Sequence, residues 1–235
     1  MVPKILRNFL ISKFKPRKWE VYFSNSILKN FFSELFSLNK IYNEQSDINR
    51  INIRNYLLEK YKEKKILFLE FGVWEGNFTN LVSKVNKNAK SRIVGFDSFE
   101  GLPENWHKHP IGTFSTDGVE PEINDKRIQY IKGWFQNTIK NNLREILKDE
   151  YEEIIISFDA DLYSSSLYCL CQLDEFKKDY IAIFDEFAPD ECRALYDYKL
   201  AFGAKVEFIA RADYDGFPSQ VICKVNTCQN GDFSP

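Results

Sequence analysis

Acidic side chains follow two apolar runs in the second half of the chain. Asp159 and Asp161 come after one run, and Asp185 and Glu186 come after the next. If these runs are neighbouring strands, the carboxylates converge at one edge of a sheet. Carboxylate oxygens without Cys or His favour Mg²⁺, Mn²⁺ or Ca²⁺ over zinc, and crowded carboxylates repel unless a cation or proton compensates them. The pattern predicts a metal site; acids that only solvate a loop or cap a helix are the alternative.

A second candidate site is the segment EFGVWEG at residues 70–76, which ends an apolar run and precedes a helical pattern. Two of the ten glycines, Gly72 and Gly76, fall here, where open α/β sheets bind their ligands. Small residues let a ligand approach the backbone, and free N–H groups at a helix start favour an anionic group. We therefore expect a nucleoside-type ligand. The spacing differs from Gly-x-Gly-x-x-Gly, and a tight turn without a ligand is the alternative.

Asp97 ends the next apolar run, 21 residues after Gly76. An acid at this place can accept hydrogen bonds from the ribose hydroxyls of a nucleoside. Ser98 and Phe99 begin a turn-rich loop that could cover the site. An Asp in an ordinary surface turn is the alternative interpretation.

The same loop holds the two histidines of the chain, His107 and His109. They could act as an alternative base or contact an acceptor, or they are simply solvated. Trp106, Trp134 and Phe135 could stack on adenine or on a sugar face. Aromatic residues make up 16% of the chain, so most of them must pack in the core.

Seven short apolar runs predict the strands that must position these residues. The first five are nearly unbroken, as in a parallel sheet buried on both faces, and the last two are joined too closely for a parallel crossover. We expect a doubly wound α/β fold whose last strand returns as an antiparallel hairpin. The runs are 66–71, 92–96, 128–131, 154–158, 181–184, 206–209 and 220–225.

Residues 1–62 lack the strand pattern. We expect a helical extension there, with helices at about 24–38 and 48–62 and no strand, ahead of a main domain over 63–235. The face of the second helix is expected to carry Ile51, Tyr56, Leu58 and Tyr61.

The first 18 residues carry six basic side chains and no acid. Interleaved with apolar residues, they could rest weakly on an anionic membrane surface. We favour instead a solvated leader, or one that contacts a second copy in a homodimer, because the apolar face is irregular.

The composition excludes several classes of protein. Hydrophobic residues at 44% and charged residues at 28% do not fit a disordered chain, and a formal charge of −2 argues against a nucleic-acid partner. The five cysteines are odd in number and lack Cys-x-x-Cys spacing, which favours reduced thiols in a cytoplasm. No apolar stretch approaches the roughly 20 residues of a membrane span, so we expect no export.

Five segments together resemble the macrocin O-methyltransferase family, over roughly residues 64–225. They are, in order, EFGVWEG at 70–76, GFDSFEGLP at 95–103, GWF at 133–135 with Thr138, DADLYSS at 159–165 and DEF at 185–187. These enzymes methylate sugar hydroxyls with S-adenosylmethionine. The resemblance implies a class I methyltransferase (Rossmann-like) fold of seven strands with the last one antiparallel.

The resemblance also implies roles for single residues. The cofactor would be held by Glu70, Gly72, Gly76, Asp97, Ser98, Phe99 and Asp159. A divalent cation, Mg²⁺ or Mn²⁺, would be held by Asp159, Asp185 and Glu186. This chain departs from the commoner Asp-Asp pair at Glu186. Its longer side chain either binds the ion directly or lies outside the ring of direct ligands.

A sugar hydroxyl is a poor nucleophile, so its proton must be removed as the oxygen attacks the sulfonium methyl group. We expect the cation to hold two vicinal hydroxyls and Asp159 to act as general base. The acceptor would be a nucleotide-activated sugar, or a saccharide of a surface polysaccharide or natural product. A metal-dependent methyltransferase for catechol-type acceptors, a nicotinamide dehydrogenase and a non-catalytic nucleoside-binding module are the alternatives.

Overall fold

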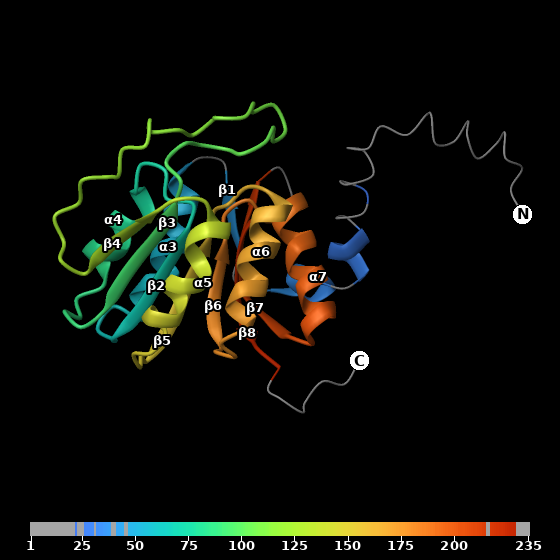
Figure 1. Cartoon of the computed structure of the whole chain (residues 1–235). Coiled ribbons are helices and arrows are strands. Elements are labelled where there is room, and N and C mark those ends of the chain that lie inside the picture. Colours follow the sequence, from blue (N-terminus) through green and yellow to red (C-terminus); the bar gives the residue numbers. More distant parts are fainter. Residues whose placement is uncertain are drawn as a thin grey trace, which may run out of the picture.

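The structure is a computed structural model that describes residues 22, 26–30, 32–38, 41–44, 47–214 and 217–228. Within these residues, eight strands form one mixed sheet in the order β1-β7-β8-β6-β5-β2-β3-β4 (Figure 1). The strands are β1 Ile41–Glu44, β2 Ile66–Phe71, β3 Arg92–Asp97, β4 Ile128–Lys132, β5 Glu153–Phe158, β6 Tyr180–Phe184, β7 Lys205–Tyr214 and β8 Phe217–Asn226.

The sheet reverses direction at only one described strand. β8 pairs antiparallel with β6 and with β7, and every other pairing in the sheet is parallel. The chain lays β2, β3 and β4 outward to one side and then returns to place β5 and β6 on the other side of β2. This is the class I methyltransferase (Rossmann-like) arrangement, so the predicted fold class, the seven predicted strands and the terminal hairpin are confirmed. The two hairpin strands are longer than predicted, because their pairing continues to Tyr214 and Phe217.

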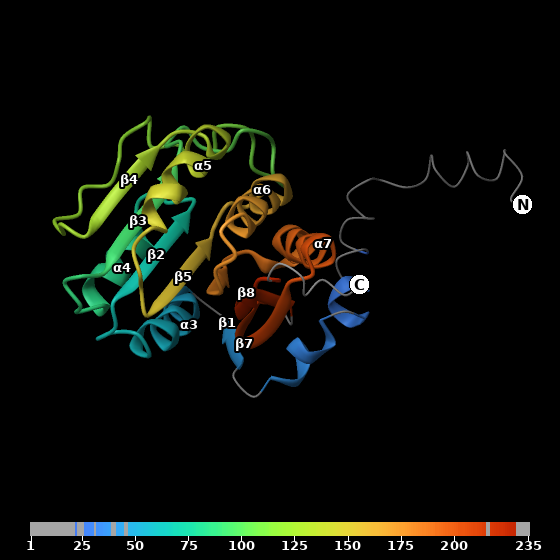
Figure 2. The ribbon, with the colours of Figure 1, turned by 60° about the horizontal axis from the view of Figure 1, so that its bottom comes forward.

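Helices cover both faces of this sheet (Figure 2). They are α3 Asp47–Glu59, α4 Asn77–Val85, α5 Phe135–Ile146, α6 Tyr163–Asp174, η2 Phe187–Glu191 and α7 Cys192–Phe202. One apolar core lies beneath α3 and α4, and a larger one lies beneath α5, α6 and α7. The strand β2 lies between the two cores and is buried along its whole length. The central strand tips are therefore held rigidly by packing on both sides.

The N-terminal segment differs from the prediction in two ways. Residues 41–44 form β1, which pairs parallel with β7 at the edge of the sheet, so the expectation of no strand was wrong. Pairing with β7 stabilises this short edge strand. Its four residues do not alternate between apolar and polar, so the sequence gives no sign of a strand. The helix expected at about 24–38 is divided: residues 26–30 are helical, Phe32 is not, and a 3₁₀ helix, η1 Ser33–Ser37, follows.

The buried face of α3 was predicted only in part: Leu58 is buried and Tyr56 and Tyr61 pack against the same core, but Ile51 does not. Ile53, Leu57 and Leu58 are buried, whereas Ile51 is 49% exposed. The stripe that meets the sheet includes a charged residue, because Arg54 follows the buried Ile53 and precedes Leu57 and Leu58 by three and four positions. This places a cation on the inner side of a helix.

Two further helices, α4 and α7, pack against the sheet through apolar residues. Phe78 and Val82 of α4 are buried in the smaller core, with Leu81 and Val85 packed beside them. The helix α7 ends at Gly203, which adopts a left-handed conformation with φ 69°. No helix among the described residues has the length and apolar character needed to cross a membrane. The basic residues 1–18 lie outside the described part of the chain.

Candidate functional site

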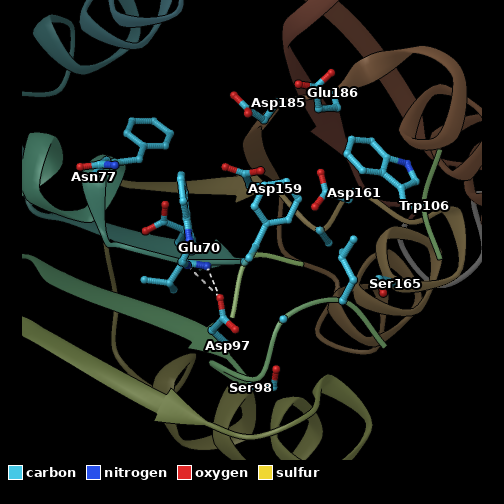
Figure 3. Close-up of a pocket in the computed structure, with 18 of the residues that line it drawn as sticks. Glu70, Asn77, Asp97, Ser98, Trp106, Asp159, Asp161, Ser165, Asp185 and Glu186 are labelled. Carbon is cyan, nitrogen blue, oxygen red and sulfur yellow. Dashed lines mark hydrogen bonds between the residues drawn. The ribbon is translucent and has the colours of Figure 1, made fainter. Parts of the chain in front are cut away.

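A cavity of about 1090 Å³ lies at the carboxyl ends of the central strands (Figure 3). Four of these strands each contribute an acid at or just after their ends: Glu70 in β2, Asp97 in β3, Asp159 after β5 and Asp185 after β6. The strand order changes direction between β2 and β5, and the crevice at such a point is where open α/β sheets bind ligands. The structure therefore brings the sequence-predicted acids to one cavity.

Gly72 is needed because two strand-end loops touch at its position. It has φ +90°, and a Cβ atom there would lie 1.9 Å from the carbonyl oxygen of Asp159. Its backbone N–H donates to the carbonyl of Phe96. Glycine at this position lets the loops after β2 and β5 approach each other while both line the cavity.

Two residues expected beside the cofactor do not line the cavity. Gly76 precedes α4 with φ +75°, and a Cβ atom there would meet Pro121 at 2.9 Å. Phe99 is buried, with its ring 6.0 Å from that of Tyr130. Their roles as cofactor contacts stay predictions. In the structure, Gly76 lies against Pro121 and the Phe99 ring packs beside Tyr130, whereas the adjacent residues Asn77 and Ser98 line the cavity.

The carboxylate of Asp97 organises the loop after β2. Its Oδ2 accepts hydrogen bonds from the backbone N–H groups of Val73 at 2.7 Å and Trp74 at 2.9 Å, and its Oδ1 accepts one from Phe99 at 2.7 Å. A carboxylate has about four acceptor positions, so about one remains for a ligand hydroxyl. Ser98, beside it, also lines the cavity, and its Oγ accepts from the N–H of Glu100.

Glu70 is buried at the inner wall of the cavity. Burial raises the pKa of its carboxyl to about 8, although a hydrogen bond from the hydroxyl of Thr79 and the charge of Arg54 both favour the ionised form. Near neutral pH this carboxyl is therefore mostly protonated.

Asp159 and Asp185 lie on adjacent strand ends. Burial and the neighbouring charge of Asp185 raise the pKa of Asp159 well above its ordinary value. About a third of the Asp159 side chain, 32%, remains exposed toward the cavity. Asp161 and Glu186 line the same cavity (Figure 3). A bound molecule thus meets a strongly acidic inner wall.

Sequence reasoning missed Arg54, the cation of this wall. Its Nη2 lies 2.5 Å from Oδ1 of Asp185 and 3.8 Å from Oδ2 of Asp159. The guanidinium also stacks over the ring of Phe78, 4.3 Å from its centroid. Burial alone would lower the pKa of Arg54, but Asp185 and Asp159 raise it above its ordinary value. The signal in the sequence was a charged residue on the apolar stripe of α3, three residues before Leu57.

The predicted metal ligands are not arranged around an ion. Among the residues that the structure describes, no group of three or more His, Cys, Asp or Glu side chains could hold a metal. Asp185 instead accepts hydrogen bonds on one oxygen, Oδ1, from Arg54 and from the amide of Gln220. The charge that motivated the metal prediction is compensated by a guanidinium, so the donor set does not fit a divalent ion in this arrangement.

A further carboxyl group without a sequence signal lies behind this wall. Glu191 is fully buried, and its Oε2 accepts a hydrogen bond from the backbone N–H of Glu186 at 3.2 Å. Burial, together with the charges of Asp159 and Asp185, raises its pKa well above its ordinary value. Glu191 thus contacts the loop that carries Glu186 from the protein side, while burial and the neighbouring acids favour its neutral form.

Aromatic side chains form the outer wall of the cavity. The Trp106 ring stacks on His109 with 5.6 Å between centroids, and Phe114 lies 5.3 Å from His109 and 5.6 Å from Trp74. We call these four residues the aromatic wall. The indole N–H of Trp106 donates to Asp190 at 3.0 Å, which ties the loop 98–127 to η2. The imidazole of His107 lies 3.5 Å from the same carboxylate, and Trp134 and Phe135 also line the cavity.

Comparisons with known proteins give likenesses of structure alone. No protein-family model and no curated protein matches the sequence. A TDP-rhamnose 3'-O-methyltransferase of calicheamicin biosynthesis is similar with a TM-score of 0.48 and 18% identity, over 89% of this chain and 94% of that chain. An O-methyltransferase from Bacillus cereus in complex with SAH has a TM-score of 0.48 and 11% identity, over 89% of this chain and 99% of that chain. At such identities these likenesses concern the general fold.

Proposed function

We propose that this protein is an O-methyltransferase that uses S-adenosylmethionine. The observation that carries the proposal is the cavity at the carboxyl ends of β2, β3, β5 and β6 in a sheet of class I methyltransferase topology. Its wall combines a close-approach glycine, Gly72, with an acid, Asp97, that has an acceptor position left for a ribose hydroxyl. A nicotinamide dehydrogenase is less well supported, because the loop lacks its glycine spacing.

The charge of the cavity supports a sulfonium ligand. Six acids line it, together with three basic residues, Arg54, Lys84 and Lys108, so the acids outnumber the cations. A positively charged methyl donor is attracted to those acids that are ionised, whereas its product, S-adenosylhomocysteine, has lost the sulfonium charge and is released more easily. The six acids are Glu70, Asp97, Asp159, Asp161, Asp185 and Glu186.

We assign the general base to Asp159. Its carboxylate borders the cavity and is 32% exposed, so an acceptor hydroxyl can reach it. As the acceptor oxygen attacks the methyl carbon, its proton passes to Asp159 and the carbon–sulfur bond breaks in line with the new bond. The step needs no group beyond donor, acceptor and carboxylate. A cation-assisted version is not part of the proposal, because Asp159 and Asp185 are arranged around Arg54.

The proposed acceptor is a sugar hydroxyl, on a nucleotide-activated sugar or on a saccharide of a surface polysaccharide or natural product. The five segments that resemble the macrocin O-methyltransferases support this choice. The aromatic wall also supports it, because indole and phenyl rings bind the apolar faces of sugar rings. The same wall could stack on a catechol ring, which makes a catechol-type acceptor the second candidate.

Methyl transfer from isotopically labelled S-adenosylmethionine to a panel of nucleotide sugars and catechols tests the proposal. We expect transfer to at least one sugar. Calorimetry should detect binding of S-adenosylmethionine without any acceptor. No heat on its addition would contradict the proposal that the protein uses this donor.

The variant Asp159→Asn tests the assignment of the base. We expect turnover to fall by at least about a hundredfold, because general-base catalysis contributes about 10²–10⁴ in rate. Donor affinity should stay within severalfold, since the amide keeps the shape of the cavity wall. Asp161→Asn is the matched control from the same loop and should keep measurable turnover. Loss in the control but not in Asp159→Asn would move the base to Asp161.

A further inference from the structure

We infer that Arg54 is an internal counter-cation that occupies the position a divalent ion would need between Asp159 and Asp185, so that this chain does not bind such an ion there. The consequence for ion binding follows from the geometry of these residues alone. The consequence for catalysis rests on the proposed function. Arg54 is in this view a positioning residue, because it acts on an acceptor through Asp159.

The first support is the geometry of the contact. A single nitrogen, Nη2, approaches both carboxylates, at 2.5 Å from Asp185 and 3.8 Å from Asp159. The nearer contact is a charge-assisted hydrogen bond from the guanidinium to Asp185. A metal ion that bridges these two oxygens, Oδ1 of Asp185 and Oδ2 of Asp159, would compete with this nitrogen for the space between them. The two cations therefore exclude each other from this position.

The second support is the burial of the guanidinium. The Arg54 side chain is only 14% exposed and is covered by the ring of Phe78. Its Nε is buried without a hydrogen-bond partner, so the carboxylates are its main compensation. If an ion displaced the guanidinium, a buried charge would lose its partners, which is among the costliest changes in a protein interior. The protein thus resists exchange of one cation for the other.

The third support is the hydrogen bonding of Asp185. Its Oδ1 accepts from Arg54 and from the amide of Gln220, a fully buried residue of β8. Two donors use the acceptor positions of this oxygen that a metal would otherwise take. The arrangement is held from two sides, by α3 and by β8.

A binding experiment with Mn²⁺ alone tests the inference without any assay of activity. Free Mn²⁺ is measured by electron paramagnetic resonance in titrations of the wild-type protein, of Arg54→Gln and of Arg54→Lys. We expect no binding above background by the wild type or by Arg54→Lys, which keeps the charge. The Arg54→Gln variant should bind at least about tenfold more tightly, because two carboxylates are then uncompensated. Adding Asp185→Asn to Arg54→Gln should abolish that binding.

Three outcomes would overturn the inference: binding by the wild type as tight as by Arg54→Gln, no binding by a folded Arg54→Gln, or binding that survives Asp185→Asn. Circular dichroism establishes that each variant is folded, and Arg92→Gln, at a half-buried position that does not line the cavity, is the control for loss of an arginine. If Arg54→Gln does not fold, the wild type and Arg54→Lys still decide, because tight binding by either contradicts an internal counter-cation.

Activity gives a second and separable readout. Methyl transfer by the wild type should be unchanged by a chelator, whereas Arg54→Gln should lose it and regain part of it with Mg²⁺. Inhibition of the wild type by a chelator that Mg²⁺ reverses would overturn the catalytic part. If no acceptor is ever methylated, the proposed function fails while the Mn²⁺ titration still stands.

Discussion

At the scale of single residues, a few contacts between strand-end loops shape the wall of the cavity. Asp97 holds the loop after β2 through three backbone N–H groups, and Gly72 in that loop leaves room for the carbonyl of Asp159. Each contact joins two strand ends. A change in either residue therefore alters the wall of the cavity as a whole.

Gly72→Ala should destabilise the protein more than Gly112→Ala does. Both glycines have positive φ, +90° and +83°, so each alanine is strained by about 1–2 kcal/mol. Only at Gly72 would the new methyl group also clash with backbone, since nothing lies within 4 Å of a Cβ at Gly112. Overpacking adds about 1–3 kcal/mol. Urea denaturation of both variants measures the difference, and equal losses would refute the close approach.

Glu70→Gln should remove part of the pH dependence of stability. The folded state raises the pKa of Glu70 from 4.5 to about 8, so between these values the folded protein keeps a proton that the unfolded chain has released. The free energy of unfolding then falls as pH rises through this window, by at most about 1.4 kcal/mol per pH unit. Above the upper value the two states bind the same number of protons at this site, and the slope ends.

The measurement is urea denaturation from about pH 5 to about pH 8. The charged groups that face Glu70 come from other elements, namely Arg54, Asp97 and Asp185, so the variant is compared with the wild type at every pH. Glu75→Gln, at an exposed position of the same loop, is the control and should keep the wild-type slope. An unchanged slope in Glu70→Gln would contradict the assignment.

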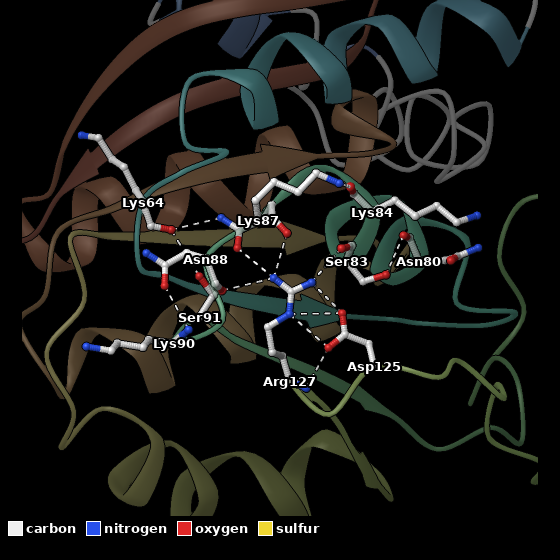
Figure 4. A network of polar contacts seen from close by, with 11 residues as sticks. Lys64, Asn80, Ser83, Lys84, Lys87, Asn88, Lys90, Ser91, Asp125 and Arg127 are labelled. Carbon is white, nitrogen blue, oxygen red and sulfur yellow. Dashed lines mark hydrogen bonds and ion pairs between the residues drawn. The ribbon is translucent and has the colours of Figure 1, made fainter.

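At the scale of elements, polar anchors hold the helices in register with the sheet. Arg127, just before β4, binds the carbonyl groups at the end of α4, with distances of 2.7 Å to Ser83, 2.8 Å to Asn86 and 3.2 Å to Asn88 (Figure 4). Asp125 pairs with the same guanidinium at 2.6 Å. These carbonyls have no partner within the helix, so the arginine serves as a cap supplied by a distant segment.

Arg127→Lys should therefore destabilise the fold although it keeps the charge. A lysine cannot reproduce the planar fork that reaches several carbonyls at once, and hydrogen bonds to a charged group contribute about 1.5–3 kcal/mol. Arg92→Lys, whose guanidinium makes an exposed contact with Gln129, is the matched control and should change stability by less than about 0.5 kcal/mol. Thermal denaturation compares them, and similar midpoints would show that the network has no structural role.

At the scale of the whole molecule, the described N-terminal elements belong to the same sheet and core as the rest. The strand β1 pairs with β7, and α3 contributes Ile53, Leu57 and Leu58 to the core that also holds Ile66 and Phe68. The proposed boundary between residues 62 and 63 therefore separates segments that share a core, and whether either segment folds alone is a question for unfolding experiments.

Ile53→Ala tests whether this shared core unfolds as a unit. Removing a fully buried isoleucine side chain costs about 2–5 kcal/mol, and we expect one cooperative transition shifted to lower urea with an unchanged slope. Ile51→Ala, on the exposed side of the same helix, should shift it by less than about 0.5 kcal/mol. An early separate transition in Ile53→Ala would instead support an independent N-terminal unit.

Much of the fold could be predicted because its information is local. The strand β2 is six consecutive buried residues, and β7 and β8 are joined too closely for any connection but a hairpin. Such patterns reflect the environment of each residue and survive in the sequence. The meeting of acids at one edge follows as well, because parallel strands end on the same side.

The sequence did not predict in the same way which residues line the cavity and which of them pair with one another. Arg54 contacts Asp185 across 131 residues, and Gly76 and Phe99 turn away from the cavity although their neighbours face it. By itself the sequence determined which segments become strands and that carboxylates gather at their ends. Only the tertiary structure decided which cation compensates those carboxylates, because a side chain's partner is chosen by packing between distant elements, and no local pattern encodes that packing.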